Sequence, residues 1–70
     1  MAIKYYKLFD LLSRRGMKKT DLIKLAKISS PTLAKLSKGE SVTVEVIDRI
    51  CMALDCQPGD IMEYISEDSE

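Results

Sequence analysis

Apolar residues recur at intervals of three and four along most of this 70-residue chain, and this spacing constrains the fold more than any other feature. It gathers apolar side chains on one face of an α-helix and differs from the strict alternation of a β-strand. About 70 residues make one domain with a small core, so several short helices have to share that core. We therefore predict a compact all-α domain of five helices.

Capping and turn residues predict the boundaries of the first two helices. The first carries an apolar stripe over residues 5–12 and ends at residues 14–16, two arginines and a glycine. Arginine complements the C-terminal dipole of a helix, and glycine tolerates the left-handed backbone that follows it. The second helix covers residues 17–26 and is poorly capped, because lysine stands where serine or threonine is preferred. The residues expected on its buried side are Leu22, Ile23, Leu25 and Ala26.

A third helix is expected over about Ser30–Lys38. Ser29 or Ser30 can accept a hydrogen bond from an exposed backbone N–H at its start. Pro31 is tolerated in the first turn, because its missing N–H has no partner within a helix there. The residues expected to point into the core are Leu33 and Leu36.

The last two helices are predicted from the same kinds of signal. Thr43 caps a fourth helix that runs through Leu54, and Pro58 opens a short fifth helix. The residues of this fifth helix that are available for burial are Ile61, Met62, Tyr64 and Ile65. Residues 1–65 then form the domain, and residues 66–70 form an acidic, flexible tail.

The charges of this neutral chain are distributed very unevenly. Residues 1–39 contain ten basic and two acidic residues, a net charge of +8, whereas residues 40–70 contain one basic and nine acidic residues, a net charge of −8. Such asymmetry indicates a basic half that meets a polyanion and an acidic half turned away from it. Composition alone leaves open the alternative that these charges only solvate the helix surfaces.

The two cysteines, Cys51 and Cys56, belong to a chain without histidine. One chain therefore lacks the four ligands of a structural zinc site. Cys51 falls on the apolar face of the fourth helix, where free cysteine packs as a small hydrophobe. We expect reduced thiols that contribute to packing, with a redox or metal role as the alternative, and we predict no metal site and no cofactor.

A particular order of apolar positions runs through two stretches, "GMKKTDLIKLAKISSPTLAKLSKGE" and "TVEVIDRICMALDCQPGDIMEY". It resembles the Cro/C1-type (XRE) helix-turn-helix family of bacterial and phage regulators, over about residues 5–65. Within that family it looks most like very small stand-alone members such as the VanU-type regulators. One departure is Lys27, which stands where the family usually has glycine because the turn needs a left-handed backbone. Lysine can adopt this conformation at a cost of about 1 kcal/mol.

The resemblance implies a Cro/C1-like DNA-binding domain in which the second and third helices form the helix-turn-helix. The third helix would then enter the major groove of DNA. By position, the base-contacting residues would be Ser30, Pro31 and Lys35. The residues near phosphates would be Lys18, Lys19, Ser29, Thr32 and Lys38. Direct readout is thin, because this surface holds no arginine, asparagine or glutamine that could make a bidentate pair with a base.

We therefore predict a sequence-specific regulator of transcription that binds double-stranded DNA. One monomer reaches only a few base pairs, so a homodimer on two half-sites is expected. The candidate residues for self-association are Met62, Tyr64 and Ile65, joined by Tyr5 or Tyr6, and closure of the core is an equally open role for them. Repression by occluding RNA polymerase is the simplest mechanism, and contact between the acidic half and polymerase is the alternative.

A protein-interaction module, such as an antitoxin-like modulator on the same scaffold, is the second class of function that the sequence allows. An enzyme is not expected, because the chain has no histidine, no recognisable paired-carboxylate cleft and no nucleotide-binding loop. We predict no small-molecule ligand. The start, "MAIKYYKLFDLL", lacks the features of a signal peptide, and no apolar run approaches the roughly 20 residues of a membrane span. A cytoplasmic location is the expectation.

Overall fold

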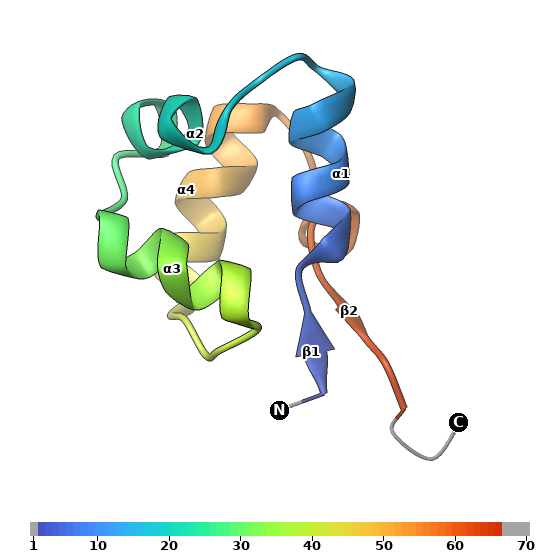
Figure 1. The fold of residues 1–70 in the computed structure, drawn as a ribbon. Coiled ribbons are helices and arrows are strands. Elements are labelled where there is room, and N and C mark those ends of the chain that lie inside the picture. The colour runs from blue at the N-terminus through green and yellow to red at the C-terminus, as the bar shows by residue number, and fades with distance from the viewer. Residues whose placement is uncertain (1, 67–70) are drawn as a thin grey trace.

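The computed structural model describes residues 2–66, and over this range it contains four α-helices, a single-turn 3₁₀-helix and a two-stranded sheet (Figure 1). The elements in order are β1 (Ile3–Lys4), α1 (Tyr6–Arg14), α2 (Lys19–Ala26), α3 (Ser30–Lys38), α4 (Val44–Leu54), η1 (Pro58–Asp60) and β2 (Glu63–Tyr64). Helices α2, α3 and α4 form one side of the molecule, and α1 with the two strands forms the other. Within the described residues, no helix is long and apolar enough to cross a membrane.

The predicted fifth helix is wrong, and the fold is mostly helical rather than all-α. The 3₁₀-helix η1 ends after one turn, closed by a 2.9 Å hydrogen bond from the Gln57 N–H to the Asp60 carboxylate. The chain then continues as β2, which pairs antiparallel with β1 so that Tyr64 lies opposite Ile3. An apolar run this short fits a helix or a strand equally well, and its pairing partner lies at the far end of the chain. Local periodicity therefore could not distinguish the two.

One apolar core joins the four helices, with Ile61 from the segment between η1 and β2. Its buried members are Tyr5, Leu8, Leu12, Leu22, Ala26, Ile28, Leu33, Leu36, Ile47, Ile50, Leu54 and Ile61. The inward orientation predicted for Leu33 and Leu36 is confirmed. Leu25 is a correction, because its side chain is 56% exposed. It lies about 60° around α2 from the buried Leu22 and about 100° from the buried Ala26, at one edge of the buried stripe, and Ile23 lies at the opposite edge.

The start of α3 forms as its sequence predicts, and that of α2 uses a different device. Ser29 is the cap of α3, and its hydroxyl oxygen accepts from the Thr32 N–H at 3.2 Å. At α2 the cap is Lys18, whose side chain has no acceptor. The Asp21 carboxylate instead accepts from the Lys18 backbone N–H at 2.9 Å, and its negative charge also suits the N-terminal end of a helix.

Candidate nucleic-acid interface

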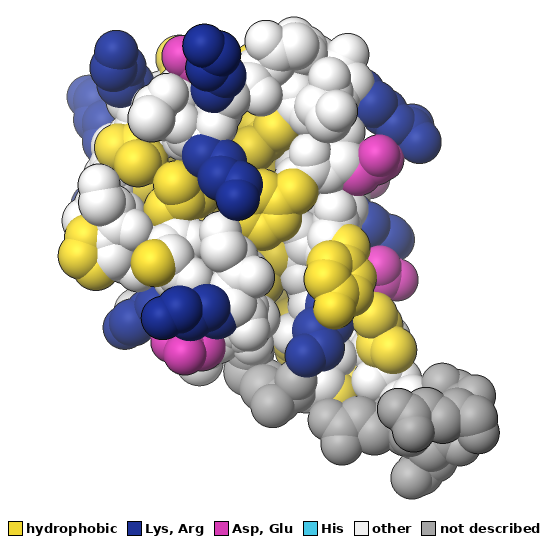
Figure 2. All heavy atoms as spheres, viewed as in Figure 1, with side chains coloured by type: hydrophobic (Ala, Val, Ile, Leu, Met, Phe, Trp, Pro, Cys, Tyr) yellow, Lys and Arg dark blue, Asp and Glu magenta, His cyan; other side chains and the backbone are white. Residues whose placement is uncertain are grey.

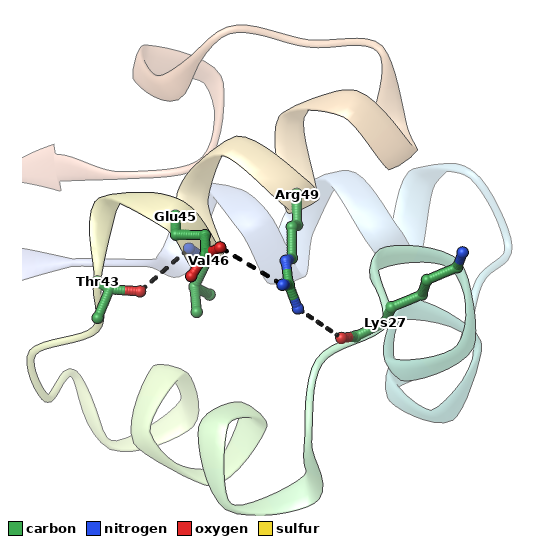
Figure 3. Close-up of polar contacts among 5 residues, drawn as sticks. All are labelled: Lys27, Thr43, Glu45, Val46 and Arg49. Atoms are coloured by element: carbon green, nitrogen blue, oxygen red, sulfur yellow. Dashed lines mark hydrogen bonds and ion pairs between the residues drawn. The ribbon is translucent and has the colours of Figure 1, made fainter.

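The turn between α2 and α3 sets the angle between these two helices. Lys27 begins this turn with φ 56° and ψ 44°, so it adopts the left-handed conformation predicted for it. Arg49 reaches from α4 and donates through Nη1 to the Lys27 carbonyl oxygen at 3.1 Å, while its Nη2 lies 3.5 Å from the Glu45 carboxylate (Figure 3). The turn is thus tied to α4 by an arginine whose role the sequence did not reveal.

The outer side of α3 carries the three residues predicted to contact bases. Ser30, Pro31 and Lys35 fall within about 140° of one another around the helix, and all three are exposed. Leu33 and Leu36 point the other way and are buried in the core. The structure therefore brings the three predicted residues together on one solvent-facing surface.

Two further exposed residues share this surface. Ala34 lies between Ser30 and Lys38 in angle around the helix, and Lys38 extends the surface toward the end of α3. We call the exposed set the reading face; its residues are Ser30, Pro31, Ala34, Lys35 and Lys38. The sequence reasoning did not assign Ala34 to the site, because alanine is common throughout helices and its side chain does not by itself indicate a contact with DNA. Its position midway along the face makes it important, since a small side chain there allows close approach of another surface.

Basic side chains are exposed on both α2 and α3. Figure 2 shows lysine and arginine side chains over α2 and α3, with apolar side chains between them. Lys18 and Lys19 lie exposed at the start of α2, and the Lys19 ammonium sits 5.1 Å from the centre of the Phe9 ring. This cation–π contact orients the Lys19 side chain while Lys19 remains exposed to solvent.

The hydroxyl groups of Ser29 and Thr32 are engaged with each other as well as with the helix start. The two oxygens lie 2.9 Å apart, so one hydroxyl donates to the other. Only one of the two hydroxyl protons is then available to an external acceptor such as a phosphate oxygen. These two predicted phosphate contacts are therefore not independent.

A shallow hollow of about 210 Å³ opens between α3 and the start of α4. Its wall includes Thr32 and Lys35, together with Ser41 and Thr43, which the sequence reasoning did not assign to the site. Thr43 caps α4, and its hydroxyl oxygen accepts from the Val46 N–H at 3.2 Å (Figure 3). The hollow places hydroxyl groups and a lysine together beside the reading face.

Comparison with known proteins places these features in a family. Residues 7–67 match the Cro/C1-type HTH DNA-binding domain. The chain belongs to this family. Its mostly helical architecture and its turn between α2 and α3 are accordingly those of a helix-turn-helix DNA-binding domain.

Two relatives strengthen the family assignment. An uncharacterized HTH-type transcriptional regulator of Bacillus subtilis (strain 168), YozG, is 37% identical over 60 residues, which cover 83% of this chain and 71% of the relative. The crystal structure of the transcriptional regulator VanUg superposes with a TM-score of 0.89 at 42% identity, covering 94% of this chain and 88% of the other. The predicted resemblance to VanU-type members of the family is therefore confirmed.

The candidate self-association residues separate into two groups. Tyr5 is 4% exposed, its hydroxyl donates to the Glu40 carbonyl oxygen at 3.2 Å, and burial raises the pKa of this hydroxyl. Met62 is half-buried and packs against the core. The exposed group contains Tyr6, Tyr64 and Ile65. Closure of the core thus accounts for Tyr5 and Met62, whereas the exposed group is left facing solvent.

Proposed function

We propose that this chain is a sequence-specific transcriptional regulator that inserts α3 into the major groove of double-stranded DNA. The reading face is the observation that carries the proposal, because its five exposed side chains lie on one side of a helix whose other side is fixed in the core. The major groove of B-DNA is wide enough for one such helix. Membership of a DNA-binding family and two relatives named as transcriptional regulators support the same function.

The chemistry of the reading face sets what it can recognise. Lys35 can donate to guanine O6 or N7, Pro31 offers an apolar contact to a thymine methyl group, and Ser30 can donate to or accept from almost any base edge. Ala34 adds a second small apolar contact. Because none of these side chains makes a bidentate pair with a base, we propose that DNA shape and dimerisation supply part of the specificity.

Phosphate contacts supply most of the affinity in this proposal. Lys18 and Lys19 are exposed at the start of α2, and Lys38 lies on the reading face itself. One of the two hydroxyl protons of Ser29 and Thr32 is available to a phosphate at the start of α3. If about four phosphates are neutralised per monomer, the log–log slope of affinity against salt is about −3.6 per monomer.

We propose that the regulator acts as a homodimer. Two recognition helices then occupy half-sites about 34 Å apart, one turn of DNA. The exposed side chains of Tyr6, Tyr64 and Ile65 are the proposed contact between the two copies. Occupation of a promoter blocks RNA polymerase, and contact of polymerase with the acidic half of the chain is the alternative route of regulation.

Fluorescence anisotropy on a pool of random DNA duplexes at several salt concentrations tests the function, followed by sequencing of the retained DNA. We expect steeply salt-dependent binding and enrichment of a site with two-fold symmetry. Lys7→Ala serves as a control for the loss of one positive charge outside the reading face. Lys7 lies on α1 and donates to the Gly59 carbonyl oxygen at 3.1 Å. Absence of binding at low salt would reject the proposal and favour the protein-interaction module.

A further inference from the structure

The two cysteines meet at the C-terminal end of α4, apart from the reading face. The helix ends at Asp55, whose φ of 52° is left-handed, and the Cys56 N–H donates to the Cys51 carbonyl oxygen at 3.1 Å. A hydrogen bond that spans five residues in this way folds the chain back as in a Schellman motif. The side chains at the two ends of such a motif come into contact, and here both of them are thiols.

The environment of these thiols agrees with the backbone geometry. Both cysteines are free and half-buried, and both pack against the core. Burial raises the pKa of the Cys56 thiol, and the neighbouring Cys51 and the Asp60 carboxylate raise it further, whereas the Arg15 guanidinium opposes them. These effects favour the protonated form of the Cys56 thiol.

A small reagent can reach the pair from solvent. Cys51 and Cys56 both line an open hollow of about 400 Å³ between α4 and η1, with Asp48 and Met52 on its wall. Cys56 also borders a second hollow, of about 350 Å³, on the side of α1. The sulfur atoms are thus partly covered by the core but not sealed from solvent.

We propose that Cys51 and Cys56 are a reversible dithiol–disulfide pair, a modification site separate from the DNA interface. The oxidant is a low-molecular-weight disulfide. The thiolate of one cysteine attacks a sulfur of this disulfide, forms a mixed disulfide and releases one small thiol. The second cysteine then attacks the protein sulfur of the mixed disulfide and releases the other small thiol. Two electrons pass from the protein to the small disulfide, and the two protein protons end on the two released thiols.

The fold makes formation of this disulfide more favourable than it is in the unfolded chain. The new bond closes a loop of residues 51–56, and the hydrogen bond from Cys56 to Cys51 already holds the ends of that loop together. A disulfide needs its two Cα atoms about 4.4–6.8 Å apart. The 3.1 Å backbone hydrogen bond from Cys56 to Cys51 holds the two residues close to each other. The disulfide is therefore expected to form more readily in the folded chain than in the unfolded chain. The factor by which folding favours the disulfide is also the factor by which the disulfide raises the folding equilibrium constant.

Equilibration of the full chain in glutathione redox buffers tests the proposal. The fraction of disulfide is measured by acid quenching, alkylation and intact mass, once in native buffer and once in concentrated urea. We expect the effective concentration of the two thiols to be at least about tenfold higher in the folded chain than in urea. An equal or lower value in the folded chain would overturn the proposal, as would a disulfide that joins two chains.

Single variants show which sulfur atoms react. Cys51→Ser and Cys56→Ser each leave one thiol, so each is expected to stop at a mixed disulfide with glutathione and to give no internal bond. Retention of the internal mass loss of two hydrogens in either variant would contradict the assignment. These measurements involve no DNA, so their outcome is independent of the proposed regulatory function.

Discussion

Arg49 donates a hydrogen bond to the carbonyl oxygen of Lys27 at 3.1 Å, and this bond joins α4 to the turn on which α3 is mounted. The Arg49 side chain is 47% exposed and is also held by Glu45, one helical turn before it. The left-handed residue of the turn is thus fixed from outside, by a donor on another helix. The orientation of the reading face depends on this contact as well as on the core.

Replacing Lys27 by glycine is expected to stabilise the domain. Lys27 has a φ of 56°, where a side chain costs about 1 kcal/mol, and glycine removes this cost. The greater freedom of glycine in the unfolded chain offsets part of the gain. Urea denaturation should therefore show a higher midpoint for Lys27→Gly, with an unchanged slope.

Lys24→Gly is the matched control, because it makes the same chemical change three residues earlier, at an exposed position inside α2. Glycine inside a helix destabilises by about 1 kcal/mol, so the midpoint should fall. If both variants shifted the midpoint downward by similar amounts, the left-handed conformation of Lys27 would not be costly and this account of the turn would be wrong.

Replacing Arg49 by methionine keeps an apolar stem and removes the hydrogen bond to the turn. We expect a loss of about 0.5–1.5 kcal/mol in the free energy of unfolding. Arg14→Met is the control: Arg14 forms an i,i+4 ion pair with Asp10 at 3.0 Å, and both side chains are largely exposed. Such pairs contribute about 0–1 kcal/mol, so Arg14→Met should cost less than Arg49→Met. The reverse order would show that the Arg49 bond contributes little.

The features predicted correctly from the sequence are those determined by neighbours in the chain. Hydroxyl caps at Ser29 and Thr43 depend on residues three positions away, whereas the left-handed conformation of Lys27 was expected from the family resemblance. Pairing of β1 with β2 and the reach of Arg49 to Lys27 depend instead on contacts between distant segments. The spacing of apolar residues along the chain does not indicate such long-range contacts. The prediction of a fifth helix was wrong for this reason.

The site shows the same division. Ser30, Pro31 and Lys35 share a solvent-facing surface because their angles around the helix follow directly from their spacing. Ser41 joins that region only because the loop after α3 folds beside Lys35. Its side chain type gave no indication of that placement.

Lys35 and Lys19 should differ in the kind of binding they support. Lys35→Ala is expected to relax the preference at one base position, at a cost of about 1–3 kcal/mol. Lys19→Ala should weaken binding to all sequences and lower the salt slope by about 1. Binding to matched and mismatched duplexes over a salt series separates the two effects. Thermal unfolding of Lys19→Ala checks for loss of its contact with Phe9. Unchanged binding in both folded variants would mean that the DNA face has been assigned wrongly.

Self-association should depend on the exposed aromatic side chain of β2. Tyr64 is 70% exposed, so Tyr64→Ser is expected to leave the fold intact and to weaken the dimer in sedimentation equilibrium. Val44→Ser is the control, because Val44 is 82% exposed and belongs to α4 rather than to β2. A dimer that is lost with Val44→Ser and kept with Tyr64→Ser would place the contact on α4 instead.

The central claim is that the reading face enters the DNA, and Ala34→Glu tests it most directly. Ala34 is exposed midway along that face, so glutamate there should leave the fold unchanged while adding a negative charge and extra bulk where the DNA must approach. Gln57→Glu adds the same charge at an exposed position beside η1 and is the matched control. Anisotropy with a DNA duplex at low salt should show a loss of at least about 100-fold in affinity for Ala34→Glu, about 2.7 kcal/mol, and little change for Gln57→Glu. Equal affinities for the two folded variants would contradict insertion of α3 into the major groove.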